Sequence, residues 1–381
     1  MGKSIAEARR FVGLDVHAET IAAAVAEKDG EVRTLGIIPN RLQSIRKLLP
    51  KLGEPGTWRA CYEAGPTGYT LYWQLTQLGA ECVVVAPTLV PMKAGDRVKT
   101  DRRDAQRLVG SFRAGELTSV WVPDAAHEAL QDLVRAREAA KRDQLRARHR
   151  LGKFLLRHGR RPEKRMSACT QCYMDWIRRE VKFEQFAQRA TLEDYLAEVD
   201  HQAQRIARLE TAIDDAIEGA PATMRAVVSA LQALRGVGKM TAITIVAEVG
   251  QLSRFARARQ LMGYSGAVAS EHSSGEHTWR GAITKTGNAH LRRVLVEAAW
   301  CQRHAPSLTR TLRARQEGLS AAVQEIAAKA RHRLSARYRR LSARGKPKQQ
   351  VVTAIARELQ GFVWAIGVEV ERNGLTGPAA A

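Results

Sequence analysis

The chain has 381 residues, with 61 Lys and Arg against 39 Asp and Glu, and a formal net charge of +22 at pH 7. This length allows two or three domains, and the charge excess indicates a polyanionic partner. Nucleic acid is the default partner, and a membrane surface is the competing explanation. No run approaches the roughly 18 consecutive apolar residues of a membrane span, and the first residues lack a signal-peptide core. We therefore expect a soluble cytoplasmic protein without membrane contact.

Cysteine usage is typical of a reducing compartment. The five cysteines are too scattered for a disulfide framework. Cys169 and Cys172 form one C-x-x-C pair, but a structural zinc site needs a second pair nearby. Two ordinary thiols in a loop are the simpler interpretation, with a zinc site as the alternative.

Residues 1–123 predict a mixed α/β domain. Three short apolar runs open it, and an Asp-Gly turn at residues 29–30 joins the second run to the third, which is typical of a hairpin. Two further buried strands each precede a helical segment. These strand and helix pairs lie at residues 57–64 and 69–78 and at residues 80–87 and 101–114. The pattern predicts a hairpin sheet extended by strand-helix units.

Residues 124–220 predict a helical middle domain. Residues 135–165 carry thirteen Lys and Arg against three acids, which indicates phosphate contact, with a solvated helix face as the alternative. Apolar residues between 192 and 217 recur in steps of three and four, as in a heptad seam, and Gly219 can end that helix. These patterns predict a coiled-coil hairpin, either a dimerisation arm or an internal helix pair.

Residues 221–381 predict a mostly helical domain. Its Gly-x-Gly-Lys stretch, Gly236–Lys239, invites comparison with a phosphate-binding loop, but Ala233 and Met240 stand where the Walker pattern needs Gly and Ser or Thr. A Gly-x-Gly turn between two apolar helices is typical of a helix-hairpin-helix, where a helix start meets a nucleic-acid phosphate. Further helices are expected near residues 288–302, 318–343 and 347–366.

Four carboxylates in the first domain need a reason. Asp15 lies inside the apolar strand FVGLDVHA, and Glu63 ends the strand RACYE. Asp101 and Asp104 lie three residues apart, on one helix face. Because unpaired buried carboxylates are costly, a cluster of four at one end of the sheet indicates bound cations, and hard oxygen ligands favour Mg²⁺. The alternative gives each acid a local role: Asp101 as a helix cap, Asp104 as an exposed helix residue and Asp15 as a turn residue.

Basic residues in three places are expected to contact nucleic-acid phosphates. Some surround the acidic pair of the first domain, one follows the Gly-x-Gly turn, and others open the helix expected near residue 288. They are Lys99, Arg102, Arg103, Arg107, Lys239, Lys285, Arg292 and Arg293.

The polar stretch SEHSSGEH spans residues 270–277. By composition, Ser273-Ser274-Gly275 predicts a flexible turn, because Ser and Gly are common turn residues. No nucleophile elbow surrounds either serine, and the nearby His272 and His277 do not form a hydrolase triad in sequence.

Several motifs together resemble those of a known family. GLDVHAET, YEAGPTGY and KTDRRDA in the first domain, with SEHSSGEHTWRGAITKTGNAHLRRVLVEAA in the last, resemble the DEDD-type insertion-sequence transposases, relatives of the pilin-gene invertases and described as bridge-RNA-guided recombinases. The resemblance covers nearly the whole chain. It implies an RNase H-like (resolvase-like) domain, a coiled-coil middle and a C-terminal transposase domain. The implied acidic tetrad is Asp15, Glu63, Asp101 and Asp104, and the implied nucleophile is Ser274.

The resemblance also implies cofactors and partners. They are Mg²⁺, a homo-oligomer (dimer or tetramer), donor and target DNA, and a noncoding bridge RNA from the same genetic element. Ser273 matches the family pattern less well than Ser274 does. One departure is Glu276-His277, where relatives often carry Gly and a basic residue; it bears on local phosphate contacts and not on the chemistry.

Three functions fit these observations. In the favoured interpretation, a DNA recombinase uses Ser274 to attack a DNA phosphate held over Mg²⁺ by the tetrad, and forms a covalent phosphoserine. The second is a resolvase-like, metal-dependent endonuclease that uses the tetrad and water without a covalent intermediate. The third is a nucleic-acid binder without catalytic activity.

Overall fold

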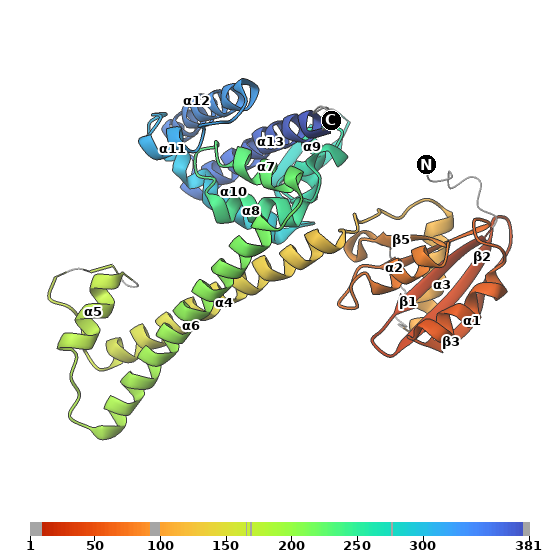
Figure 1. Ribbon diagram of the computed structural model, residues 1–381, viewed down its shortest axis with the longest axis horizontal. Helices are drawn as coiled ribbons and strands as arrows, with labels where there is room; N and C mark the ends of the chain where they lie inside the picture. The colour runs from red at the N-terminus through yellow and green to blue at the C-terminus, as the bar shows by residue number, and fades with distance from the viewer. Residues whose placement is uncertain (1–9, 92–99, 165, 168–169, 276, 376–381) are drawn as a thin grey trace. The chain divides into compact units, whose positions relative to one another are not determined.

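The chain divides into two compact units, Met1–Val122 and Pro123–Ala381. The computed structural model describes residues 10–91, 100–164, 166–167, 170–275 and 277–375. The first unit is a mixed α/β domain, and the second is helical apart from one two-stranded sheet (Figure 1). The expected combination of an α/β domain with a helical remainder is therefore confirmed, while the expected division of the second unit at residue 220 stays a prediction.

A five-stranded sheet with the order β3-β2-β1-β4-β5 forms the centre of the first unit. The strands are β1 (Arg10–Val16), β2 (Thr20–Glu27), β3 (Val32–Pro39), β4 (Trp58–Glu63) and β5 (Glu81–Val85). The first three are antiparallel, and β4 and β5 add in parallel beside β1. The predicted hairpin between β2 and β3 and both predicted later strands are confirmed, and the topology is compatible with an RNase H-like domain.

Helices cover both faces of this sheet. The helices α1 (Leu42–Leu52) and α2 (Thr70–Gln77) pack on one face, and α3 (Asp101–Arg113) packs on the other. The strands alternate accordingly, since Val12 belongs to the first cluster and Phe11 to the second. A short 3-10 helix, η2 (Pro87–Leu89), follows β5. The predicted helices α2 and α3 are confirmed, whereas α1 went unpredicted.

Gly13 brings α3 close to β1. A Cβ atom at this position would lie 2.6 Å from the carbonyl oxygen of Ala105 and 2.7 Å from the nitrogen of Val109. Both are backbone atoms of α3, so rotation of a side chain cannot relieve the contact. The glycine thus holds the start of α3 near the end of β1, where Asp15 follows.

Two long helices form an arm in the second unit (Figure 1). They are α4 (Ala125–Arg157) and α6 (Phe186–Glu218), with α5 (Gln171–Glu180) at the far end. Arg137 Nε donates to Glu210 Oε1 at 2.8 Å, and Arg205 Nη1 donates to Asp143 Oδ2 at 3.1 Å. Since a later residue of α4 meets an earlier residue of α6, the two helices are antiparallel.

The arm matches the predicted helical hairpin and pairs within one chain. Buried residues of α6 recur every seven positions, at Leu192, Val199, Ile206 and Ile213. Several basic residues of α4 have acidic partners inside the protein: Arg135, Arg137, Arg142 and Arg146. Phosphate contact by the other basic residues of α4, and dimerisation through the arm, stay predictions.

The remaining helices of the second unit are α7 (Ala222–Leu231), α8 (Lys239–Val249), η3 (Leu252–Arg254), α9 (Ala258–Tyr264), α10 (Ala289–Ala299), η4 (Trp300–Arg303), α11 (Arg310–Ala314), α12 (Ala321–Ala343) and α13 (Lys348–Leu375). Two buried helices organise this part of the unit: α8 packs against α4, α7 and α10, and α13 packs against α7, α9, α10 and α12. The Gly-x-Gly turn lies between α7 and α8, as predicted. The three helices expected after residue 288 are confirmed as α10, α12 and α13.

The helix α13 is long and apolar enough to span a membrane, by length and composition alone. Its most apolar window has a mean hydropathy of 1.3, and 56% of that window is buried inside the protein. Val351, Ile355, Leu359 and Val363 of α13 belong to the main core of the unit. Core burial accounts for the apolar character of this helix, and the expected cytoplasmic location stays a prediction.

Replacing Gly13 with Ala is expected to destabilise the first unit by about 1–3 kcal/mol, because the new methyl group overlaps backbone atoms of α3. Hydrogen exchange of β1 and α3 peptides in the full chain measures this loss. Gly110→Ala is the matched control: a Cβ there meets nothing within 4 Å, and Ala is favoured in a helix. Equal protection in the two variants would contradict the proposed backbone contact.

Candidate active site

Two of the predicted acids lie at the ends of neighbouring parallel strands. Asp15 is the second-last residue of β1, and Glu63 is the last residue of β4. The two strands pair in parallel, with Leu14 opposite Tyr62. Their carboxyl ends therefore meet at one edge of the sheet. Asp15 and Glu63 both line an open pocket of about 740 Å³ at this edge.

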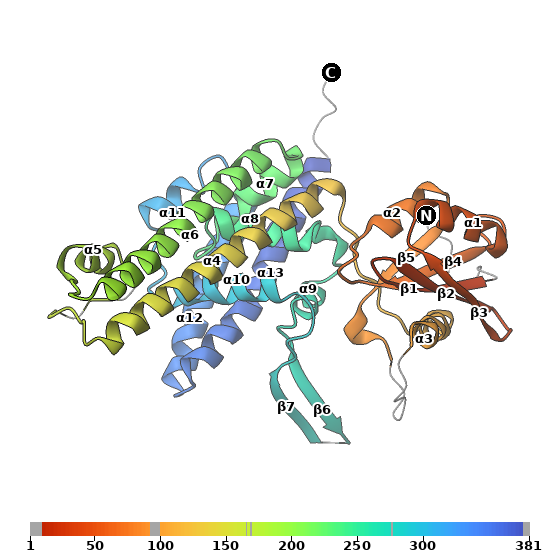
Figure 2. The ribbon, with the colours of Figure 1, turned by 90° about the horizontal axis from the view of Figure 1, so that it is seen from below.

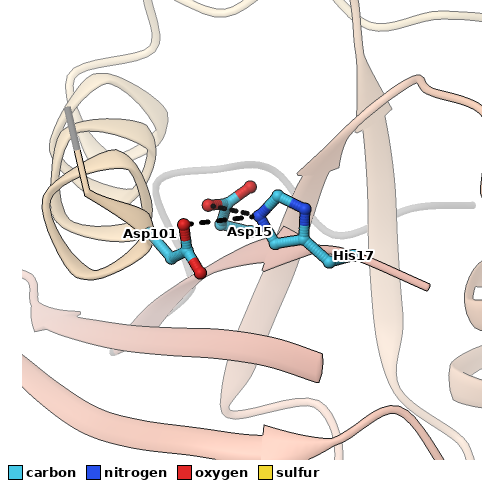
Figure 3. Close-up of side chains that lie close together, drawn as sticks. All are labelled: Asp15, His17 and Asp101. Carbon is cyan, nitrogen blue, oxygen red and sulfur yellow. Dashed lines mark ion pairs between the residues drawn. The ribbon is translucent and has the colours of Figure 1, made fainter. Parts of the chain in front are cut away.

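Asp15, His17 and Asp101 converge beside this pocket (Figure 3). The Nε2 atom of His17 lies 3.4 Å from Asp15 Oδ2 and 3.5 Å from Asp101 Oδ1. The backbone holds His17 in place, because its N–H donates to the Thr20 carbonyl and its carbonyl accepts from Asn40 Nδ2, each at 2.8 Å. One ligand atom from each of the three side chains lies within 4.8 Å of the others.

Asp104 lies one turn further along α3. Its side chain is 11% exposed, and its Oδ1 atom forms an ion pair with Arg107 Nη2 at 2.9 Å. Thr100, and not Asp101, caps the helix by accepting from the Arg103 N–H. The local roles considered for Asp15, Asp101 and Asp104 are therefore wrong: Asp15 lies in a strand, Asp101 is not the cap, and Asp104 is mostly buried.

The electrostatics around Asp15 favour a cation. Burial raises the pKa of Asp15 above its usual 3.8; the nearby His17 lowers it, while the charges of Asp104 and Asp101 raise it further. A raised pKa means that the ionised carboxylate is costly here without a positive partner. Two carboxylate oxygens and an imidazole nitrogen suit a divalent metal ion. Asp15, His17 and Asp101 can therefore bind one, with Glu63 and Asp104 nearby.

His17 went unpredicted as a member of this site. Its signal was present in the sequence, because residues two apart on a strand project to the same face. Asp15 and His17 have this spacing in GLDVHA. The spacing alone does not show that α3 brings Asp101 to the same place.

The stretch that contains Ser274 is a β-hairpin, which projects from the helices of the second unit (Figure 2). It consists of β6 (Ala269–Ser274) and β7 (His277–Ile283). The predicted flexible turn is wrong for Ser273 and Ser274, which are strand residues, and right for Gly275, whose φ is 58°. Cross-strand pairing imposes the extended conformation, which the small polar residues alone do not predict.

Ser273 and Ser274 have different surroundings. Ser273 Oγ donates to Glu271 Oε1 at 2.9 Å, and Arg280 Nε donates to Glu271 Oε2 at 3.0 Å. The hydrogen bond from Ser273, followed by that from Arg280, lowers the pKa of Glu271. Ser274 instead lies opposite His277 at the tip of the hairpin. Only Ser273 thus belongs to the network with Glu271.

A buried acid in α8 supports the start of α10, just after the hairpin. Glu248 is 0% exposed and accepts two hydrogen bonds from Arg135, Nε–Oε1 and Nη2–Oε2, each 2.8 Å. Asn288 Nδ2 also donates to Glu248 Oε2 at 2.7 Å. The Oδ1 atom of Asn288 caps α10 by accepting from the Leu291 N–H at 2.9 Å. The arm helix α4, α8 and α10 are therefore joined through one carboxylate.

A second acid, Glu138 of α4, also anchors the start of α10. Glu138 accepts from His290 Nδ1 at 2.6 Å and from Arg293 Nε at 3.0 Å, and it also pairs with Arg142. Burial raises the pKa of Glu138, but the hydrogen bonds and charges of Arg293 and His290 outweigh it and lower the pKa to about 2. Glu138 is therefore ionised at neutral pH and fixes α10 to the arm.

The seven described basic residues that are predicted to contact phosphates fall into two groups. Arg102, Arg103 and Lys285 are exposed. The others have partners within the protein: Arg107 with Asp104, Lys239 with Asp214 at 2.8 Å, Arg292 with the Ser265 carbonyl at 2.6 Å, and Arg293 with Glu138. Lys99 lies outside the described residues. Phosphate contact stays a prediction.

The C-x-x-C pair is described only in part. Cys169 lies outside the described residues, and Cys172 is an exposed free thiol. The zinc alternative stays a prediction.

Comparisons with known proteins find two family matches along the chain. Residues 12–159 match a profile of DEDD transposases of the IS110 type, and residues 228–313 match the profile described as the transposase IS116/IS110/IS902 family. The first match contains the acids and His17, and the second contains the serine hairpin. The matches define the chain as a transposase, an enzyme that cuts and rejoins DNA, so the interpretation as a binder without catalysis is wrong.

Full-length relatives identify the family. A Sinorhizobium fredii protein named as a transposase is 46% identical over 378 residues, which cover 98% of this chain and 92% of the relative. The transposase for insertion sequence element IS1533 of Leptospira borgpetersenii is 32% identical, over 88% of this chain and 97% of the relative. The chain belongs to the IS110/IS116 family of insertion-sequence transposases.

Asp15→Asn is expected to weaken divalent-metal binding at least about tenfold, because it removes a charged ligand. The same change is expected to stabilise the metal-free fold at pH 7. Because folding raises the pKa of Asp15, its stabilising contribution is present at acid pH and is lost as pH rises and the carboxylate ionises. Calorimetric titration with Mg²⁺ and Mn²⁺ measures the first effect, and hydrogen exchange of β1 and β2 in EDTA measures the second.

Asp29→Asn is the control, since Asp29 is exposed in the turn between β2 and β3. Neither the affinity for divalent metal nor the stability of the metal-free fold should change in this variant. Unaltered metal affinity in Asp15→Asn would rule out the proposed ligand role of Asp15.

Proposed function

We propose that this transposase cuts and rejoins DNA strands with two groups of residues: an acidic site that holds Mg²⁺, and Ser274 as the nucleophile. The acidic site consists of Asp15, Glu63, Asp101 and Asp104, and it also includes His17. The observation that carries the proposal is the convergence of Asp15, His17 and Asp101 within 4.8 Å, in the segment that matches the DEDD transposase profile. The substrates are donor and target DNA.

The choice of Ser274 over Ser273 rests on their different hydrogen bonds. Ser273 is bonded to Glu271, which Arg280 also holds. Ser274 is exposed at the hairpin tip, so a DNA backbone can approach it. Ser274 also matches the family motif better.

The proposed chemistry conserves the energy of the phosphodiester bond. Ser274 Oγ attacks the phosphorus, the P–O bond to a deoxyribose oxygen breaks, and the strand is left joined to the protein through phosphoserine. The free hydroxyl of the exchanged strand then attacks this phosphoserine and releases Ser274. A divalent cation, when bound, stabilises charge on the phosphate oxygens. The protein side chains position that phosphate and the attacking hydroxyl.

A metal-dependent endonuclease is the alternative. In that mechanism the acidic site alone directs water to the phosphate, and no covalent adduct forms. The compact cluster around His17 supports both mechanisms equally. The adduct distinguishes them.

The proposal includes a noncoding bridge RNA that selects donor and target DNA, and a dimer or tetramer as the active form. The net charge of +22 supports contact with polyanions. Nuclease-resistant nucleic acid that copurifies with the full chain is expected to include one RNA encoded beside the transposase gene. Sequencing after DNase and RNase treatments identifies it, and the recovery of only unrelated RNA fragments would contradict this role.

Ser274→Ala is expected to abolish the covalent adduct and to reduce strand exchange at least about 10³-fold. A denaturing gel of the protein with a plasmid that carries its own insertion sequence measures the adduct. Ser273→Ala is the matched control and should keep the adduct. An adduct that persists in Ser274→Ala and disappears in Ser273→Ala would show that the serine assignment is wrong.

A further inference from the structure

The β6–β7 hairpin has two chemically different faces. Residues directly opposite each other in an antiparallel pair project to the same face, and successive residues alternate between faces. The register pairs Ser274 with His277, Ser273 with Thr278, His272 with Trp279 and Glu271 with Arg280. One face therefore carries His272, Ser274, His277 and Trp279, which we name the Ser274 face. The other carries Glu271, Ser273, Thr278 and Arg280.

The contacts of the side chains agree with this division. The rings of His272 and Trp279 contact each other on the Ser274 face, with centroids 5.6 Å apart. Glu271 joins Ser273 and Arg280 on the other face. Three polar side chains of that second face are therefore bonded to each other: Glu271, Ser273 and Arg280. The Ser274 face presents two imidazoles, a hydroxyl and an indole that is 64% exposed.

His277 is the titratable residue directly opposite Ser274. Directly opposite residues of an antiparallel pair have Cβ atoms roughly 4.5–5.5 Å apart, so a ring nitrogen of His277 can reach the Ser274 hydroxyl by side-chain rotation. A serine hydroxyl is a weak nucleophile until a base removes its proton. A neutral imidazole can accept that proton.

We propose that His277 accepts the proton of Ser274 during attack on the DNA phosphate. His277 is then a catalytic residue, and its role depends on the proposed role of Ser274 as the nucleophile. The bond between Oγ and phosphorus forms, the bond from phosphorus to the deoxyribose oxygen breaks, and the hydroxyl proton moves to the imidazole. The leaving oxygen takes a proton from water, which leaves hydroxide. When the strand is rejoined, the attacking hydroxyl gives its proton to that hydroxide, and the imidazolium returns its proton to Ser274.

The other charged groups of the hairpin are placed differently. His272 shares the Ser274 face but lies opposite Trp279, two pairs further from the tip, and its ring contacts the indole. Glu271 and Arg280 pair with each other on the opposite face. Glu276, the sequence neighbour of His277, lies outside the described residues. His272 is therefore the matched control for an exposed histidine on the same face.

The test is the rate of adduct formation by the full chain, together with its copurified nucleic acid, on a plasmid that carries its own insertion sequence. His277→Ala is expected to slow adduct formation by about 100-fold or more, and His272→Ala by less than about threefold. In the wild type the rate should rise with pH as imidazole loses its proton, and this rise should be absent in His277→Ala. Added free imidazole should restore part of the rate in His277→Ala.

The outcomes separate this inference from the function on which it rests. If Ser274→Ala keeps the adduct, the nucleophile itself is misassigned. If Ser274→Ala loses the adduct but His277→Ala keeps the wild-type rate and pH profile, the role of His277 alone is overturned. If His277→Ala binds DNA normally but reacts slowly and gains nothing from imidazole, His277 shapes the hairpin and transfers no proton, which also overturns the inference.

Discussion

The contact between two backbones at Gly13 is the constraint on which the acidic site depends. Without a side chain on β1 at this point, α3 approaches closely enough to set Asp101 and Asp104 beside Asp15. Those carboxylates raise the free energy of one another's ionised forms, and His17 offsets only part of that cost. The packing energy of α3 on the sheet therefore maintains an arrangement of charges that a polypeptide otherwise avoids, and a bound divalent cation would relieve the repulsion.

The second unit treats its buried acids in the opposite way. Glu248 is bonded to Arg135 and Asn288, and Glu138 to His290 and Arg293, so each carboxylate has a full set of donors. Removing one partner of such a group typically costs several kcal/mol, because the remaining charge stays buried. These acids hold helices together, whereas Asp15 lacks an arginine or lysine partner among the contacts described for it. The difference separates structural carboxylates from candidate metal ligands.

Local pattern predicted most of the secondary structure, since the hairpin at residues 29–30 and the helix at residues 101–114 depend on nearby residues. The helix α1 went unpredicted; Pro50 lies inside it, where proline removes an N–H donor and disfavours a helix. Strand pairing at Ser273 and Ser274 was missed because their residue types favour turns. His17 and Glu138 escaped notice because their partners lie far away in sequence, at Asp101 and His290. The four acids could be predicted from the cost of carboxylates in apolar strands, whereas the role of Ser274 came from the family resemblance alone.

The helix α4 has a consequence beyond its contribution to the arm. It runs without interruption from Ala125 to Arg157, about 50 Å at 1.5 Å per residue. The same helix carries Arg135 and Glu138, which hold α8 and the start of α10. Side chains of one continuous helix therefore join the arm to both α8 and the start of α10. A change in the tilt of α4 would displace the anchors of both helices together.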